Sequence, residues 1–247
     1  MPEYCRLLKG EFLKQKKSFI WPVVIFTPLV DALLTFVNLF LRYDYLKGLE
    51  ANQDLSSWQL LLTQHHFIWA FLLPLVATII TSHVHYLEYK SNSWKQTLVL
   101  PVSRIKVYLA KWSTVFILNI LMILQNSIYL LIAGKILGFP EIPDIHLITI
   151  YSVYQILAIT GLIGIQCFLS ANLYNANLAL AIGFVGVASS LFFAQSEQLA
   201  KFIPYAHIIF ALPDPTINNT IALYYGLTFG LIFLAVGLLF FQSKEIY

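Results

Sequence analysis

The chain has little charge and almost no cysteine. Of its 247 residues, 11% are Asp, Glu, Lys or Arg, which is less than half the roughly 25% of ordinary globular proteins. The net charge of +3 is small, and no basic soluble segment offers the kind of face that binds nucleic acid. The two cysteines, Cys5 and Cys167, fall in the N-terminal segment and inside an apolar run. This placement argues against a disulfide framework.

Sequence motifs of nucleotide-binding and hydrolytic enzymes are also missing. A phosphate-binding loop needs Gly-x-x-x-x-Gly-Lys-Ser/Thr, but the Gly134-Lys135 pair is followed by Ile136. Neither Gly-x-Ser-x-Gly nor His-Glu-x-x-His occurs. We therefore expect no catalytic residue in this chain, and no cofactor bound by it.

The histidines do not form a pattern that holds a metal ion. Four of them gather in two pairs near opposite ends of one apolar run: His65 with His66, and His83 with His85. On a single helix these pairs would be about 25 Å apart, and the members of each pair would point to different faces. The sequence therefore predicts no metal site.

Six long apolar runs are the main feature that is present. They cover residues 21–41, 67–82, 112–133, 147–169, 176–194 and 221–241. A helix crosses the hydrocarbon core with about 20 residues, and in that core a helix satisfies every backbone polar group within one segment. The sequence therefore predicts an all-α membrane protein with six transmembrane helices, forming one domain over residues 1–247.

The lysines and arginines predict the orientation. Eleven of the fifteen fall in the two terminal segments and in the loop between the second and third runs. The other four are Arg42, Lys47, Lys135 and Lys201. Short cytoplasmic loops carry an excess of Lys and Arg. We therefore expect both termini in the cytoplasm and the chain in a cytoplasmic membrane.

Residues 1–19 have helical periodicity. Their larger apolar side chains fall on one side of the helix, with the basic side chains largely opposite: Tyr4, Leu7, Leu8 and Phe12 against Arg6, Lys9, Lys16 and Lys17. This pattern predicts a helix in the cytoplasmic interface with its apolar face in lipid. A basic flank that only fixes orientation is the alternative.

The two outer segments differ in composition. Residues 42–64 carry both signs of charge and are expected to form an ordinary outer loop. Residues 195–220 are too apolar for a simple loop, yet Pro204, Pro213 and Pro215 interrupt them. A segment too short to span must turn back, so we expect 195–220 to be re-entrant in the outer leaflet.

The loop over residues 83–111 is long for a cytoplasmic connection. Residues 86–99 mix large apolar with charged side chains, which predicts a short helix across the membrane surface. Pro101 would end this helix, and Ser103 could cap the next one. The segment either anchors the chain at the surface or docks on a partner protein.

One carboxylate falls in the middle of the first run. A lone Asp31 at that depth costs about 3 kcal/mol, so we expect it to face protein, water or a partner. It shares one helical face with three other polar residues: Thr27, Thr35 and Asn38. This stripe either lines a substrate path or forms interhelical hydrogen bonds. An ion- or proton-coupled carrier, or a membrane-embedded enzyme or receptor using Asp31, is the alternative function, although the predicted topology scatters Asp31 and the histidines.

Three short runs in the 83–111 loop resemble a known family. They are residues 88–95 (Glu-Tyr-Lys-Ser-Asn-Ser-Trp-Lys), 98–104 (Leu-Val-Leu-Pro-Val-Ser-Arg) and 108–111 (Tyr-Leu-Ala-Lys). Together with the arrangement of runs, they resemble the membrane (permease) subunit of bacterial type-2 ATP-binding-cassette exporters. The likeness is to the branch that includes lantibiotic-immunity permeases.

The resemblance implies partners and a mechanism. In such permeases this loop forms a coupling helix on an ATPase subunit, which implies an ATPase interface made of Glu88, Tyr89, Trp94, Lys95, Pro101 and Arg104. The partners would be an ABC ATPase dimer carrying ATP and Mg²⁺, and a second permease subunit, identical or homologous. The chain would then expel a hydrophobic or amphipathic substrate, such as an antimicrobial peptide, from a bacterial inner membrane. The resemblance does not identify the substrate.

Overall fold

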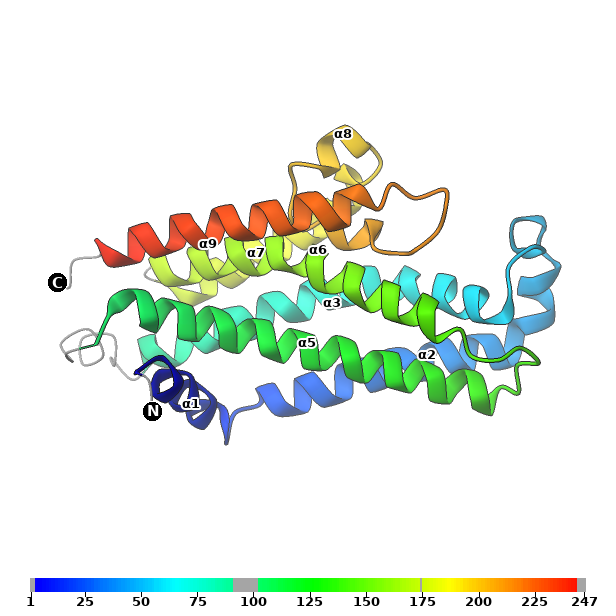
Figure 1. The fold of residues 1–247 in the computed structure, drawn as a ribbon, viewed down its shortest axis with the longest axis horizontal. Coiled ribbons are helices and arrows are strands. Elements are labelled where there is room, and N and C mark those ends of the chain that lie inside the picture. The colour runs from blue at the N-terminus through cyan, green and yellow to red at the C-terminus, as the bar shows by residue number, and fades with distance from the viewer. Residues whose placement is uncertain (1–2, 91–101, 174, 244–247) are drawn as a thin grey trace.

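The computed structural model describes residues 3–90, 102–173 and 175–243, and in these ranges every regular element is helical. The main helices are α1 (Glu3–Gln15), α2 (Ile20–Gly48), α3 (Ser57–Lys90), α5 (Arg104–Ile136), α6 (Ile145–Asn172), α7 (Ala176–Phe193) and α9 (Gly226–Gln242). The short ones are η1 (Glu50–Asn52), α8 (Glu197–Ala200), η2 (His207–Phe210) and the π-helical η3 (Ile221–Tyr225). The helices after α1 form an elongated bundle, with α1 and the C-terminal end of α9 at one end (Figure 1). The all-α prediction is confirmed for the described residues.

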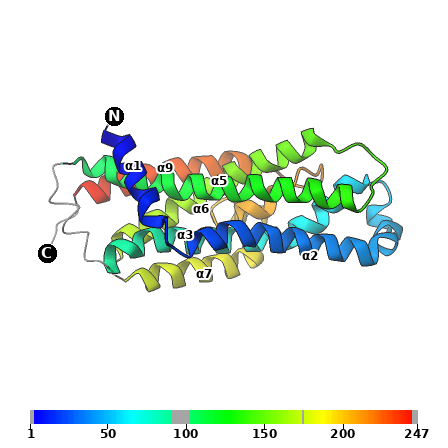
Figure 2. The ribbon, with the colours of Figure 1, turned by 90° about the horizontal axis from the view of Figure 1, so that it is seen from below.

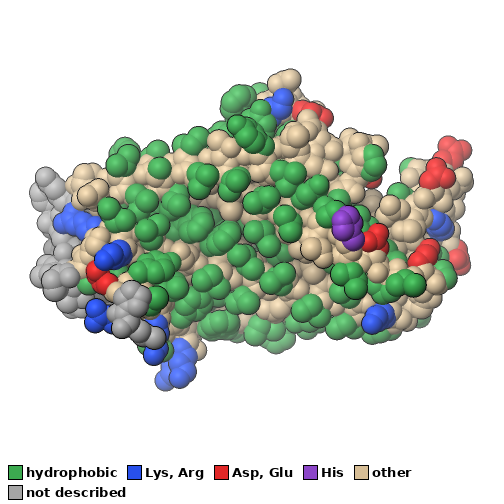
Figure 3. Space-filling model, in the orientation of Figure 1, with side chains coloured by type: hydrophobic (Ala, Val, Ile, Leu, Met, Phe, Trp, Pro, Cys, Tyr) green, Lys and Arg blue, Asp and Glu red, His purple; other side chains and the backbone are tan. Residues whose placement is uncertain are grey.

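The helices have the length and composition of membrane spans. Within the described ranges five are long and apolar enough to cross a membrane: α2, α3, α5, α6 and the continuous η3–α9. The shorter α7 covers the fifth predicted run with 18 residues, about 27 Å. Apolar side chains cover the middle of the bundle, and charged side chains lie towards its two ends and on the projecting segment that holds α8 (Figure 3). The structure therefore supports a membrane protein with five clear spans and one shorter apolar helix.

Two predicted loops are largely helical. The second run, expected over 67–82, lies within the 34-residue α3, which is about 50 Å long. The expected outer loop over 42–64 is wrong, because α2 continues to Gly48 and α3 begins at Ser57. Trp58 and Leu60 at the start of α3 are buried, so packing stabilises helix beyond the apolar run. The expected cytoplasmic loop is shorter for the same reason, since residues 83–90 belong to α3 and 104–111 to α5.

Glycines bring α6 and α9 close together. A Cβ atom on Gly226 would lie 2.6 Å from the carbonyl oxygen of Leu157, and one on Gly230 would lie 2.9 Å from Thr160. Thr160 Oγ1 donates a hydrogen bond of 3.0 Å to the carbonyl oxygen of Gly226. Small residues and hydroxyl donors of this kind are typical of helix contacts in membranes.

The N-terminal helix packs on protein. Figure 2 shows α1 lying across the bundle near one end, where it crosses α5. Leu7 and Phe12 pack against the buried core, and the Tyr4 hydroxyl donates a 2.8 Å hydrogen bond to Ser113 Oγ. Leu7 and Phe12 therefore pack in part on protein, because the end of the bundle offers them an apolar surface, and the contact of this face with lipid stays a prediction. Leu13 remains 59% exposed.

The segment before α9 turns back against the bundle. It contains α8 and η2, and α8 lies beside the bundle, short of the far ends of α3 and α5 (Figure 1). Tyr205, Ala206 and Ile208 are almost completely buried. A Cβ atom on Gly186 of α7 would lie 2.6 Å from the Tyr205 ring, so this glycine makes room for it. The shape agrees with a returning segment, and its depth in the bilayer stays a prediction.

Candidate functional site

Two lysines and two carboxylates join three helices at the end of the bundle that holds α1. Lys111 Nζ of α5 lies 2.9 Å from Glu11 Oε2 of α1 and 2.8 Å from Glu88 Oε1 of α3. Lys14 Nζ lies 2.8 Å from Glu11 Oε1 and also contacts Glu88. We call Glu11, Lys14, Glu88 and Lys111 the ion-pair cluster. It links α1 to the two helices that flank residues 91–101.

Burial makes the ion-pair cluster sensitive to the loss of a member. The side chains of Lys111 and Glu88 are each 1% exposed, whereas that of Lys14 is 40% exposed. Removing one partner of a buried ion pair costs about 3–5 kcal/mol, since the other charge is left without compensation. Burial opposes the charged form of Lys14, but the carboxylates of Glu11 and Glu88 outweigh it and raise the pKa of Lys14. The two carboxylates therefore favour the charged form of Lys14.

Further contacts hold both flanks of residues 91–101. The Tyr89 hydroxyl donates to the carbonyl oxygen of Ser170 at 3.2 Å, near the end of α6. Arg104 Nη1 donates to the carbonyl oxygen of Gln242 at 3.1 Å, at the end of α9. The N–H of Ser103 donates to Glu3 Oε1 at 3.0 Å. Ser103 occupies the N-cap position of α5 as expected, but its side chain makes no capping hydrogen bond.

The predicted ATPase interface is described only in part. Glu88 and Tyr89 lie at the end of α3, and Arg104 begins α5. The carboxylate of Glu88 is directed into the ion-pair cluster, where Lys111 and Lys14 bind it. Trp94, Lys95 and Pro101 lie outside the described residues, as does most of the helix expected over 86–99, whose first residues continue α3. The interface therefore stays a prediction.

The polar stripe of α2 faces the bundle. Asp31 and Thr35 are buried, and Asn38 Nδ2 donates a 3.2 Å hydrogen bond to Gln64 Oε1 of α3. Thr27 is half-buried on the same face. The Thr35 hydroxyl donates to the carbonyl oxygen of Asp31 at 3.0 Å, within the helix. The periodicity therefore predicted the buried face correctly, and Asn38 makes the interhelical hydrogen bond expected as one alternative.

Asp31 is bound by two neighbouring helices. Its Oδ2 lies 2.6 Å from His65 Nδ1 of α3 and accepts a 3.3 Å hydrogen bond from Asn126 Nδ2 of α5. Asp31 and His65 are each 0% exposed. Asp31 Oδ1 and both ring nitrogens of His65 are buried without a hydrogen-bond partner in the described part of the chain, so the 2.6 Å contact of His65 Nδ1 with Asp31 Oδ2 is a close approach that lacks hydrogen-bond geometry. The expectation that topology scatters Asp31 and the histidines is therefore wrong for His65, because the second run extends outward far enough to place it opposite Asp31.

The polar contacts continue across the bundle. His66 Nδ1 lies 2.9 Å from the Tyr151 hydroxyl of α6, and His66 Nε2 lies 3.0 Å from the carbonyl oxygen of Ile209. Trp69 Nε1 donates a 2.9 Å hydrogen bond to Gln155 Oε1. We call these residues together the buried polar network: Asp31, His65, His66, Trp69, Asn126, Tyr151 and Gln155. It connects α2, α3, α5 and α6 to the segment before α9.

The sequence did not predict several members of the ion-pair cluster and of the buried polar network. Glu11 and Lys111 are ordinary charges in the sequence, and only the fold places them beside Glu88. Lys111 lies directly before the third apolar run, and His65 lies two residues before the second, so both positions were equally compatible with an exposed loop. The partner of His65 could not be assigned without knowing how α2 packs on α3.

A sequence comparison identifies the family. The family model described as "ABC-2 family transporter protein" matches residues 7–195. The match covers α1 to α7, including the ion-pair cluster and the polar stripe of α2. No curated protein matches the chain.

Proposed function

The chain belongs to the ABC-2 family of transporter proteins, and from that premise we propose that it is the permease of an exporter driven by a separate ATPase. Members of this family are the membrane subunits of ABC transporters, and the ATP-hydrolysing site lies in a partner. The proposed substrate is hydrophobic or amphipathic, and an antimicrobial peptide is the first to test. ATP and Mg²⁺ would bind to the partner ATPase dimer.

The main observation in support of the proposal is that the residues on both sides of 91–101 are bound to several helices of the bundle. Glu88 on one flank and Lys111 beyond the other share the ion-pair cluster with α1. Tyr89 binds the end of α6, and Arg104 binds the end of α9. A force applied to residues 91–101 would therefore reach α1, α3, α5, α6 and α9 together. A segment that couples ATP hydrolysis to helix movement needs such an arrangement.

The assembly follows from the same proposal. Two permease subunits, identical or homologous, would enclose the substrate path above two ATPase subunits. The expected orientation places residues 91–101 in the cytoplasm and the chain in a bacterial inner membrane. We also propose that the chain is similar to the lantibiotic-immunity branch, and for this reason a peptide substrate is tested first.

The test compares two double variants, each of which removes one aromatic and one cationic side chain. One lies in residues 91–101 and the other in the last turns of α2. Trp94→Ala with Lys95→Ala alters the proposed coupling segment, while Arg42→Ala with Tyr45→Ala removes a cation–π pair, 5.2 Å from Arg42 Cζ to the Tyr45 ring centre. We expect the first pair to lower ATPase co-purification and substrate-stimulated ATP hydrolysis at least about tenfold, since aromatic and charged residues dominate protein interfaces. The second pair should leave both unchanged. An unaltered complex with the first pair, or transport by the purified chain alone, would refute the proposal.

A second candidate function is an ion- or proton-coupled carrier that uses Asp31. The buried Asp31–His65 pair favours it, because intramembrane ionisable groups often mark proton or ion paths. This candidate requires transport in reconstituted vesicles without ATP, driven by a pH gradient and abolished by Asp31→Asn. The exporter proposal expects no such transport.

A further inference from the structure

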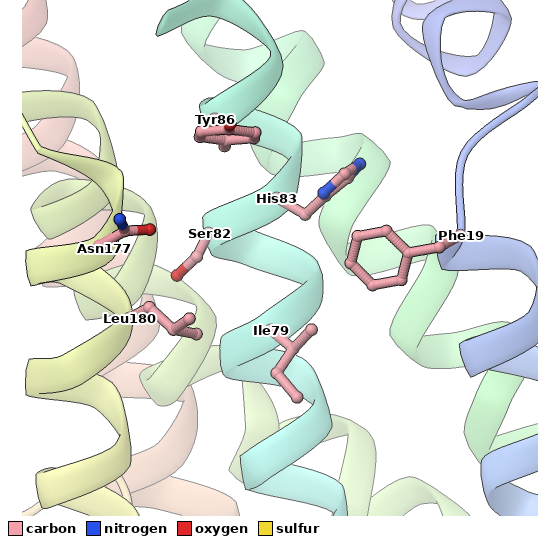
Figure 4. A pocket seen from close by; sticks show the side chains of 7 residues that line it. All are labelled: Phe19, Ile79, Ser82, His83, Tyr86, Asn177 and Leu180. Atoms are coloured by element: carbon pink, nitrogen blue, oxygen red, sulfur yellow. The ribbon is translucent and has the colours of Figure 1, made fainter. Parts of the chain in front are cut away.

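A pocket opens on the side of the bundle near the end that holds α1. Its empty volume is about 450 Å³, and seven described residues line it: Phe19, Ile79, Ser82, His83, Tyr86, Asn177 and Leu180. Figure 4 shows α3 between the first turns of α7 on one side and the start of α2 on the other. The pocket is therefore a groove along α3, between two other helices.

The groove is apolar at one end and polar at the other. Ile79 and Leu180 lie at the lower end of Figure 4, while Tyr86 and Asn177 lie above them, towards the end of α3. None of the seven lining residues is acidic. A ligand that fits would have an apolar tail and a polar head directed to the bundle end that holds α1.

Two helix N-termini and two lysines lie at the bundle end towards which the polar end of the groove is directed. The helices α2 and α7 both begin here, at Ile20 and Ala176, so both present the positive ends of their dipoles. Phe19 at the N-cap of α2 makes no side-chain capping hydrogen bond, but the Ile20 N–H donates to Ser18 Oγ at 3.2 Å, and Asn175 caps α7 by accepting from the Asn177 N–H. Lys16 and Lys17 are exposed just before Phe19, in the turn that joins α1 to α2. Helix N-termini and lysines together favour an anionic head group.

The side chain of His83 is held in place between α2 and the groove. Its Nε2 lies 2.8 Å from Ser18 Oγ, and its ring meets the Phe19 ring edge-on, with centres 4.3 Å apart. Ser82 is 5% exposed, and its Oγ accepts a 3.2 Å hydrogen bond from Gln166. The lining is therefore ordered by contacts to α2 and α6 before any ligand binds.

We propose that this groove binds an anionic phospholipid of the cytoplasmic leaflet. One acyl chain would lie along Ile79 and Leu180, and the phosphate would lie near Asn177 and the two lysines. The assignment to that leaflet takes the orientation expected from the lysine and arginine distribution. The charge around the polar end disfavours a cationic peptide.

The test uses photo-cross-linking in lipid nanodiscs. Tyr86, which lines the groove, is replaced by benzoylphenylalanine, and the adducts are identified by mass spectrometry. The nanodiscs contain phosphatidylcholine with phosphatidylglycerol as the minor lipid. We expect phosphatidylglycerol adducts several-fold above its share of the bilayer. The same replacement at Val185, which lies on α7 outside the groove and is 69% exposed, should report the bulk composition.

Charge variants test the head-group site. Lys16→Gln with Lys17→Gln should reduce the enrichment at position 86 to the bulk ratio, because one lysine near the membrane surface is worth up to about fivefold in binding an anionic lipid. Arg42→Gln with Lys135→Gln, the same charge change at the opposite end, should leave it intact. Adducts at the bulk lipid ratio, adducts to protein, or enrichment unaffected by the two lysines would overturn the proposal. Loss of the lipid adduct on adding inorganic phosphate would also overturn it, because the groove would then bind the phosphate group alone.

Discussion

His65 Nδ1 lies 2.6 Å from Asp31 Oδ2, and neither side chain is exposed. This contact joins the middle of α2 to the first third of α3 and gives the carboxylate of Asp31 a partner. Asn126 of α5 adds a hydrogen bond to the same oxygen. The cost of placing Asp31 in an apolar region is therefore offset within the chain, before any substrate or second subunit is considered.

The pair can be tested by removing one member and then both. His65→Leu should destabilise the protein by about 3–5 kcal/mol, because it leaves the Asp31 carboxylate buried beside an apolar side chain. Asp31→Leu combined with His65→Leu should recover most of that loss, since two apolar residues leave no charge to compensate. Unfolding followed by circular dichroism in detergent measures these two variants and Asp31→Leu alone. If the two changes are simply additive, Asp31 and His65 do not interact.

This pair also shows what the sequence can and cannot predict. The stripe of Thr27, Asp31, Thr35 and Asn38 follows from helical periodicity, and the structure confirms that it faces the bundle. The partner of Asp31 depends on how far α3 extends and on which face it packs against α2. Neither property is encoded locally, because polar residues at the ends of a span are equally compatible with a loop.

Lys111 should be much more important for stability than Lys14. Lys111→Met leaves Glu11 and Glu88 facing each other with one exposed lysine between them, which should cost about 3–5 kcal/mol. Lys14→Met removes a side chain that is 40% exposed, and such pairs are worth about 1 kcal/mol or less. Thermal unfolding of the two variants in the same detergent measures the difference. Equal losses would show that Lys111 is not buried between the two carboxylates.

The docking of α1 should weaken in acid. The hydrogen bond and charge of Lys106 and the N–H of Ser103 lower the pKa of Glu3 below its ordinary value of 4.5. The pKa of Glu3 is lower when α1 is docked than when it is released. The Glu3 carboxylate therefore stabilises docking fully above pH 4.5, and this stabilisation is lost as the pH falls through the lowered pKa. A spin label on Cys5, an exposed thiol of α1, should therefore become more mobile as the pH is lowered below about 4.5.

The matched variant for this prediction is Glu3→Gln. It removes the carboxylate that binds Lys106 and Ser103, so the label on Cys5 should already be more mobile at neutral pH. Mobility should then change little over the same acidic range. A full acid response in Glu3→Gln would assign the pH dependence to another group.

Gly226 should not tolerate a methyl group. The Cβ atom of Gly226→Ala would lie 2.6 Å from the backbone oxygen of Leu157, and backbone cannot move aside as a side chain can. Such overpacking typically costs about 1–3 kcal/mol. Gly10→Ala in α1 meets nothing within 4 Å and should stabilise its helix by about 0.5–1 kcal/mol. We expect Gly226→Ala to lower the unfolding temperature and Gly10→Ala to raise it. An unchanged unfolding temperature for Gly226→Ala would contradict the close packing of α6 and α9.

The helices themselves were predictable where hydrophobicity alone determines them. All six apolar runs are helical, and the turn between the fourth and fifth falls between Asn172 and Ala176 as expected. The ends of α2, α3 and α5 were not predictable, because these helices continue as packed, partly polar helix beyond the runs. The same limit applies to Glu88, which the family resemblance places at an ATPase surface but which the fold surrounds with Lys14 and Lys111.

The orientation of the bundle can be measured directly with cysteines at its two ends. Cys5 is first replaced by serine, because it is exposed, while Cys167 is buried in α6. Ser93→Cys then places a thiol in the proposed coupling segment, and Asp54→Cys places one between η1 and α3, at the other end of the 34-residue α3. A membrane-impermeant maleimide added to intact cells should label Asp54→Cys. It should label Ser93→Cys only after the membrane is permeabilised, because the excess of Lys and Arg predicts that residues 91–101 lie in the cytoplasm. Labelling of Ser93→Cys in intact cells would place residues 91–101 outside, where no ATPase could act on them.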